Sequence, residues 1–221
     1  QLRRAGQQPD ALASAPCRTR DGTAFTLLAS ANCSTPQSIT AAIQAGVSGI
    51  GLVRTESVVV EQIDEAGQIE IYRRCLQNAG DKPVTVRTCD WGADDGGRWI
   101  YGVQEQVTDE SVVMTQLSAL MQAGTQGNLR VVLPMIADGE AWKTRMDQLG
   151  RCRAALRERG VPFREDVPVG CLIEIPAAAL LAGEIIDGGA RFLVIDVDDL
   201  TQYTCGVSRK EAGPAYRADN P

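Results

Sequence analysis

Charged side chains stand at the ends of four apolar runs, where a bare charge costs free energy unless something compensates it. Arg54 ends "GIGLVR" and Arg87 ends "VTVR", while Glu174 ends "VGCLIE" and Asp199 follows "RFLVIDVD". Guanidinium groups bind phosphate or carboxylate through two parallel hydrogen bonds. Paired carboxylates bind hard divalent cations. These residue types therefore suggest an anionic substrate and a metal ion at one site.

Glu174 and Asp199 are the candidate metal ligands. Neighbouring parallel strands lie about 4.8 Å apart, so acids at the ends of adjacent strands can share one ion. An all-oxygen pair that leaves room for water and substrate suits Mg²⁺ or Mn²⁺ better than zinc. The alternative is structural: Glu174 would pair with a nearby arginine, and Asp199 would cap the short helix begun by "DDLTQYT". We favour the structural alternative for either acid alone and the metal site for the two together.

The arginines also have two interpretations. Arg54 and Arg87 could converge on an anionic substrate, or they could form structural salt bridges to Glu56 and Asp90. Spacing alone does not separate these alternatives. Arg209, in "GVSRKE", is a weaker candidate because a lone loop arginine is usually solvated.

Apolar runs alternate with helical patterns along most of the chain. The predicted strands cover residues 25–31, 49–55, 84–88, 129–135, 169–175 and 191–197. The predicted helices are centred on residues 36–45, 69–80, 112–124, 139–160 and 177–186. Thr35 as N-cap, Pro36 in the first turn and Gly46 past the end frame the first of these helices. This alternation predicts an α/β fold with parallel strands covered on both faces.

Six β/α units suit either a doubly wound sheet or most of a (β/α)8 TIM-type barrel. The charged residues at the carboxyl ends of the predicted strands favour the barrel, because barrel enzymes build their sites on that face. A Gly-rich dinucleotide fingerprint does not follow the first predicted strand. We therefore expect a linker helix and turn over residues 1–22 and an incomplete barrel over residues 23–221.

Composition and charge exclude some classes of binding partner. The net charge of −6 and the pI of about 4.8 argue against nucleic-acid and anionic membrane surfaces, which need clustered Lys and Arg. The 7 cysteines include no C-x-x-C pair, so we interpret them as reduced thiols of a cytoplasmic protein. No apolar stretch approaches the roughly 20 residues of a membrane span. Small-molecule chemistry in the cytoplasm is the expectation.

Five motifs, in order and with their spacing, resemble one family. They are "GIGLVRTE", "VTVRTCDWGADD", "VVLPMI", "LIEIPAAALLAGEI" and "DDLTQYTCGVSR". The resemblance is to the phosphoenolpyruvate-binding barrel of Enzyme I of the sugar phosphotransferase system, the phosphoenolpyruvate-protein phosphotransferases. It covers the chain from Asp21 onward. Pyruvate phosphate dikinase and phosphoenolpyruvate synthase share a similar barrel, but the "R-T-x-D-x-G-x-D" form around Arg87 is closer to Enzyme I.

The resemblance implies roles for particular residues. Glu174 and Asp199 would bind Mg²⁺ or Mn²⁺, while Arg54, Arg87 and Arg209 hold the phosphoryl group of phosphoenolpyruvate. Asp198 would lie beside the substrate. The family passes the phosphoryl group to a histidine on a separate swivelling domain, then to the carrier HPr and on to a sugar permease. The complete protein would be a homodimer.

Several residues depart from the family pattern. The chain has no histidine and no "C-G-E" loop, so the acceptor histidine and the acid cysteine are expected outside it. Asp196 and Asp198 replace the Gly and Asn of "G-T-N-D-L-T-Q-Y", Asp95 replaces a lysine, and Arg98 is a loose counterpart of the "G-W-R" arginine. Added negative charge works against a phosphate ligand. The alternative function is therefore a non-catalytic barrel that binds a ligand or regulates a pathway.

Overall fold

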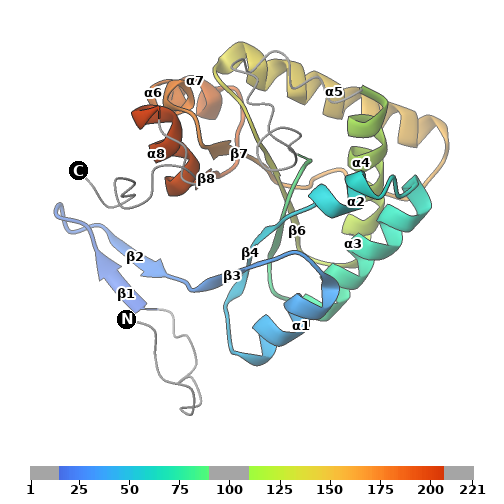
Figure 1. Ribbon diagram of the computed structural model, residues 1–221, viewed down its shortest axis with the longest axis horizontal. Helices are drawn as coiled ribbons and strands as arrows, with labels where there is room; N and C mark the ends of the chain where they lie inside the picture. The colour runs from blue at the N-terminus through green and yellow to red at the C-terminus, as the bar shows by residue number, and fades with distance from the viewer. Residues whose placement is uncertain (1–14, 90–109, 207–221) are drawn as a thin grey trace.

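The computed structural model describes residues 15–89 and 110–206, which are built around a six-stranded parallel sheet (Figure 1). Its strands are β3 (Ser30–Cys33), β4 (Gly49–Val53), β5 (Val84–Arg87), β6 (Leu129–Leu133), β7 (Val169–Ile173) and β8 (Leu193–Ile195). Each strand pairs with the next one along the chain. A doubly wound sheet reverses its strand order partway across, whereas a barrel does not. The strand order confirms the predicted barrel architecture, and within the described residues β3 and β8 are the two open edges.

Helices connect the successive strands, and a last helix follows β8. They are α1 (Pro36–Gln44), α2 (Glu56–Val60), α3 (Glu65–Ala79), α4 (Glu110–Ala123), α5 (Gly139–Glu158), α6 (Pro176–Leu180), α7 (Ala182–Asp187) and α8 (Val197–Cys205), with a 3₁₀ turn η1 (Gly124–Gln126). Figure 1 shows α1, α3, α4 and α5 along one side of the sheet and α6, α7 and α8 grouped around the end of β7 and β8. The strands therefore present one face to the helices and the other to the barrel interior.

Most of the hydrophobic core lies between the sheet and these helices. Its largest fully buried side chains include Tyr72, Leu120 and Trp142, each at most 1% exposed. Burying each side chain of this size stabilises the folded state by about 2 kcal/mol. This core fixes where each helix sits on the sheet.

A smaller hydrophobic cluster lies on the inner face of the sheet. Leu52 on β4, Val132 on β6 and Leu172 on β7 form it, with Phe192 and Val194 packed against them. Side chains at positions two apart in a strand point to the same face. The interior layer therefore defines the inner face, on which functional side chains of a barrel lie.

The N-terminal strand prediction was wrong. Residues 25–31 do not form the first strand of the sheet. Instead β1 (Ala15–Arg18) pairs with β2 (Ala24–Leu27) in a separate antiparallel hairpin, and the sheet begins with β3. Asp21 closes the hairpin turn by accepting a hydrogen bond from the Thr23 main-chain N–H (3.1 Å), next to Gly22 with φ +88°. Figure 1 shows this hairpin projecting away from the sheet.

Other local predictions agree with the structure in type, with one further difference. Thr35 caps α1, and its hydroxyl and that of Ser38 form a reciprocal capping box. The predicted helix over residues 177–186 is two short helices, because Leu181 leaves helical geometry at φ −102° and ψ 16°. The division at residues 22 and 23 falls within the hairpin, and residues 1–14 lie outside the described part, so that boundary remains a prediction.

All seven cysteines are free thiols, as predicted. Cys33, Cys75, Cys152 and Cys171 are buried, and Cys205 is exposed. Among the helices of the described residues, none combines the length and the apolar character that crossing a membrane requires.

Candidate functional site

Arg54 and Arg87 occupy neighbouring positions at the carboxyl ends of β4 and β5. The strands pair Val53 with Val86, so the next residue on each strand is an arginine. Arg54 lies two residues beyond the interior Leu52, and Arg87 lies opposite the interior Val132. Residues directly opposite in a sheet share a face. Both arginines therefore belong to the inner face, with Arg54 exposed and Arg87 7% exposed.

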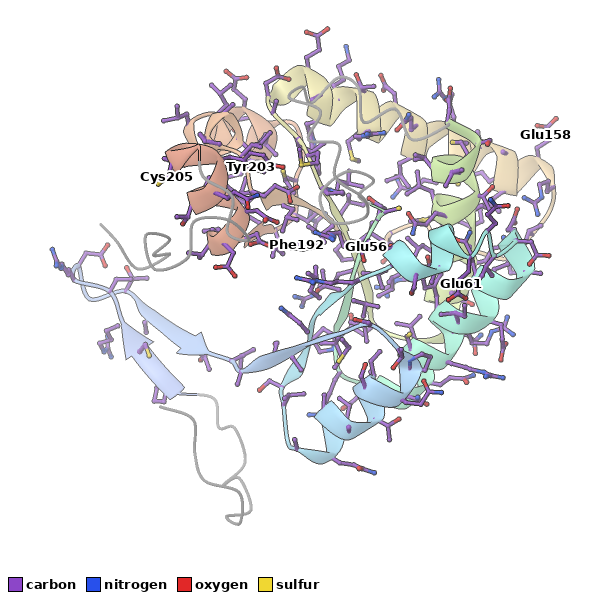
Figure 2. The ribbon with its side chains drawn as sticks, viewed as in Figure 1. Glu56, Glu61, Glu158, Phe192, Tyr203 and Cys205 are labelled. Carbon is purple, nitrogen blue, oxygen red and sulfur yellow. The ribbon has the colours of Figure 1, made fainter. Side chains whose placement is uncertain are left out.

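Arg87 forms an ion pair with Glu56, the first residue of α2. Figure 2 shows Glu56 at the start of this helix, beside the strand ends. A salt bridge to Glu56 was part of the structural alternative, and Arg87 makes it, while Asp90 lies outside the described residues. The pair holds Arg87 in place at the end of β5.

Glu174 follows β7 and is 1% exposed. Its Oε1 accepts a hydrogen bond of 2.5 Å from the main-chain N–H of Met135, which follows β6. Met135 has φ +54°, a left-handed conformation that costs a non-glycine residue about 1 kcal/mol or more. Burial, together with the charge of Glu174, raises the pKa of Cys171 to about 12. The left-handed turn at Met135 thus orients the Glu174 carboxylate on the inner face, two residues beyond Leu172.

Asp199 lies in the first turn of α8 and is 8% exposed. The alternative expectation that it caps this helix was wrong, because Asp196 is the N-cap and its Oδ1 accepts from the Asp199 N–H at 3.1 Å. The Asp196 N–H donates to the carbonyl of Ile173 at 3.0 Å. That bond keeps the start of α8 against the end of β7, where Glu174 lies. Asp198, in the same turn, is exposed.

The donor set near β7 and β8 consists of carboxylates. Within residues 15–89 and 110–206, no three His, Cys, Asp or Glu side chains gather closely enough to hold a metal ion. Two buried carboxylates on adjoining elements suit a hard cation that keeps water and substrate oxygens as its other ligands. Glu174 and Asp199 fit such an ion and do not fit a closed zinc site.

Three predicted residues cannot be placed. Arg209, Asp95 and Arg98 lie outside the described residues. The structure therefore brings together Arg54 with Arg87, and the Glu174 segment with the first turn of α8.

A buried polar network that the sequence did not reveal lies behind the two arginines. Gln116 on α4 is 1% exposed and contacts Thr55, Tyr72 and Cys89. The Thr55 hydroxyl in turn donates to the main-chain oxygen of Arg87 at 2.9 Å. The sequence feature that could have revealed this network is the polar Gln116 inside the apolar run "VVMTQLSALM".

A small cavity lies beside this network, where β5 and β6 end. It has a volume of about 20 Å³, and its lining includes Thr88, Cys89, Gln116 and Arg145. A space of that size holds about one water molecule. It is too small for an organic substrate, so we place the candidate site on the inner face at the strand ends.

Sequence comparisons give a consistent family. The family model described as "PEP-utilising enzyme, PEP-binding domain" matches residues 7–221. A phosphoenolpyruvate-protein phosphotransferase of Borreliella burgdorferi is 33% identical over 207 residues, covering 86% of this chain and 36% of the relative. Proteins of the same name from Streptococcus equinus and Lactococcus lactis subsp. lactis are each 32% identical, covering 92% and 96% of this chain but 38% and 40% of themselves. The chain thus spans little more than a third of the length of these relatives.

Solved structures show a more distant likeness. The citrate lyase beta subunit complexed with oxaloacetate and magnesium from M. tuberculosis has a TM-score of 0.42 and 19% identity, covering 86% of this chain and 68% of that chain. A TM-score at this level carries no argument about function.

Proposed function

The chain belongs to the PEP-utilising enzymes, as their PEP-binding domain, and we propose that it is the substrate-binding part of a phosphoenolpyruvate-protein phosphotransferase. In this role it binds phosphoenolpyruvate at the carboxyl ends of the barrel strands. The relatives are longer than this chain, so the complete reaction belongs to the longer protein.

The observation that carries the proposal is the neighbouring position of Arg54 and Arg87. Two guanidinium groups side by side suit a dianionic phosphoryl group, which offers several acceptor oxygens. Arg87 is nearly buried, so its attraction to a phosphate is screened less by water than that of a surface arginine. We assign the phosphoryl end of the substrate to these two arginines, with Arg209 as a further candidate.

Glu174 and Asp199 are proposed to hold Mg²⁺ or Mn²⁺ at the other end of the site. When bound, such a cation supplies positive charge to oxygen atoms of the substrate. The chain's own part is to fix the two carboxylates: the Met135 N–H orients Glu174, and the N-terminal turn of α8 orients Asp199. Phosphoryl transfer passes through a loose transition state, so orientation and charge supply most of the catalysis.

The residues in this chain bind and orient the substrate. A phosphoryl group leaving phosphoenolpyruvate needs a nucleophile, and this chain has no histidine to accept it. We place the acceptor histidine and the acid cysteine in other parts of the longer protein. Purified chain mixed with labelled phosphoenolpyruvate should therefore acquire no stable phosphate label.

Partners and location follow from the same proposal. The phosphoryl group would pass from a swivelling histidine domain to an HPr-like carrier for sugar uptake, and the complete protein would form a homodimer. Seven free thiols support a reducing, cytoplasmic location.

Calorimetric titration of phosphoenolpyruvate in the presence of Mn²⁺ tests the anion site. We expect Arg54→Gln to weaken binding by about tenfold or more, since a charge-assisted hydrogen bond is lost. Arg74→Gln, which alters an exposed arginine on α3, is the matched control. Equal affinity in parent and Arg54→Gln would remove Arg54 from the site.

A second function rests on the acids of α8. Asp196 and Asp198 place two extra negative charges in or beside its first turn, where a phosphate would approach. A barrel that binds a less charged ligand without catalysis fits that observation. Tighter binding of pyruvate than of phosphoenolpyruvate would favour it.

A further inference from the structure

Gln116 joins the chain segments that carry the two arginines. Its Nε2 donates to the Thr55 hydroxyl at 3.0 Å, and its Oε1 accepts from the Cys89 N–H at 2.7 Å. Thr55 directly follows Arg54, and Cys89 lies two residues after Arg87. One side chain on α4 therefore bridges the ends of β4 and β5.

The bonding pattern fits an amide and no other side chain of this length. The Thr55 hydroxyl gives its proton to the Arg87 carbonyl, so it accepts from Gln116. Tyr72 also accepts from Nε2, at 3.0 Å, while the Cys89 N–H needs an acceptor. The site requires two donated protons and one accepting oxygen, which glutamine supplies.

Burial makes this bridge stiff. Thr55, Tyr72 and Gln116 are each 1% exposed, so bulk water does not compete for these hydrogen bonds. A buried polar group that loses its hydrogen-bond partner costs about 1–3 kcal/mol of free energy, so the bonds of this network stay formed. The Arg87 carbonyl and the segment after Arg54 are thereby kept at one separation.

We propose that Gln116 is a positioning residue that sets the spacing of Arg54 and Arg87 for the phosphoryl group. This inference rests on the proposed function and deepens it. Gln116 acts through Thr55 and the main chain of residues 87–89 and does not itself touch the substrate. It governs recognition of the phosphoryl end and leaves the carboxylate and metal end, at β7 and α8, unaffected.

The test compares two ligands on matched variants. Phosphoenolpyruvate and pyruvate are each titrated in Mn²⁺ against the parent chain, Gln116→Leu and Gln122→Leu. Gln122 lies on the same helix about 9 Å further along and binds Glu65 and Ser118, away from the strand ends. Both substitutions remove a partly or fully buried amide from α4, so they are matched in kind.

We expect Gln116→Leu to weaken phosphoenolpyruvate binding by about tenfold while changing pyruvate binding by less than about twofold. Gln122→Leu should change neither. Equal phosphoenolpyruvate affinity in Gln116→Leu and parent overturns the positioning role. Equal losses for both ligands also overturn it, because they indicate general loss of structure.

If Gln116→Leu does not fold, Thr55→Val tests the same positioning role. It keeps the side-chain shape and removes only the hydroxyl between Gln116 and the Arg87 carbonyl. The same selective loss of phosphoenolpyruvate affinity is expected, and its absence overturns the inference. Failure of the parent chain to bind phosphoenolpyruvate at all would overturn the proposed function and this inference with it.

Discussion

Glu56 and Arg87 form an ion pair that ties the start of α2 to the end of β5. The Arg87 side chain is 9% exposed and that of Glu56 is 31% exposed, so the pair is only partly screened by water. The arginine that we assign to the phosphoryl group therefore already faces a carboxylate. An incoming phosphate must share Arg87 with Glu56 or displace it.

Glu56→Gln is expected to strengthen phosphoenolpyruvate binding in Mn²⁺ by severalfold, roughly threefold to tenfold, because the competing charge is removed. The same change should lower the free energy of unfolding by about 1 kcal/mol. Calorimetry and urea unfolding measure the two effects. Glu61→Gln, an exposed neighbour labelled in Figure 2, is the control. Weaker binding in Glu56→Gln would contradict this competition and show that the hold of the ion pair on Arg87 matters more than the competing charge.

Asp198→Asn should also favour phosphoenolpyruvate. An ionised carboxylate has no proton to donate to a phosphate oxygen, whereas an amide has two. Asp198 is exposed, so we expect a modest gain of about threefold for phosphoenolpyruvate and a smaller one for pyruvate. Asp187→Asn at the end of α7 provides a matched exposed control. An unchanged or lowered phosphoenolpyruvate affinity would mean that Asp198 does not face the phosphate.

Acid stability should depend on Glu65. Burial raises the pKa of Glu65, but hydrogen bonds from Arg159, Ser118 and Gln122 outweigh it and leave that pKa below its ordinary value. Because the folded-state pKa is lowered, this network stabilises the fold above the unfolded-state pKa, and that stability is lost as pH falls through the folded-state pKa.

Glu65→Gln should therefore cost about 1 kcal/mol at about pH 7 and much less at about pH 3. Urea unfolding at both pH values gives the comparison. Glu70→Gln on the same helix, whose partners Arg73 and Arg74 are surface residues, should show a smaller difference. A cost for Glu65→Gln that is the same at both pH values would contradict the assigned network.

Thiol reactivity should separate the exposed cysteine from the buried ones. Burial raises the pKa of Cys75 to about 12 and that of Cys152 to about 11, so neither forms much thiolate at neutral pH. Cys205 is exposed and should react with a maleimide first. Mass spectrometry of the native and urea-unfolded chain measures this. Equal labelling of Cys75 and Cys205 in native conditions would contradict the burial of Cys75 on α3.

Much of the fold could be predicted because buried parallel strands leave continuous apolar runs. The strands that contain Leu52, Val132 and Leu172 were found this way. The prediction of one strand over residues 25–31 was wrong because a single apolar run spans the end of β2 and the start of β3. Leu28, between those strands, is 56% exposed, and no pattern of residue types distinguishes that from burial.

The site was predictable only in part. Arg54, Arg87 and Glu174 were identifiable because each directly follows an apolar run. The cap of α8 was not, since Asp196, Asp198 and Asp199 are all suitable caps and the end of β8 decides among them. The contacts of Gln116 were also hidden, because they join segments far apart in the sequence, 61 residues in the case of Thr55.

The central claim is that the arginines and the two acids bind opposite ends of one ligand. Phosphoenolpyruvate affinity measured with and without Mn²⁺ tests this most directly, in the parent, Glu174→Gln and the exposed control Glu140→Gln. Coupling within one site predicts that Mn²⁺ strengthens binding at least about tenfold in the parent and in Glu140→Gln, a coupling of about 1.4 kcal/mol. Glu174→Gln should lose that coupling. The single site would be contradicted if the parent bound phosphoenolpyruvate with the same affinity with and without Mn²⁺. A full Mn²⁺ effect in Glu174→Gln would contradict it as well.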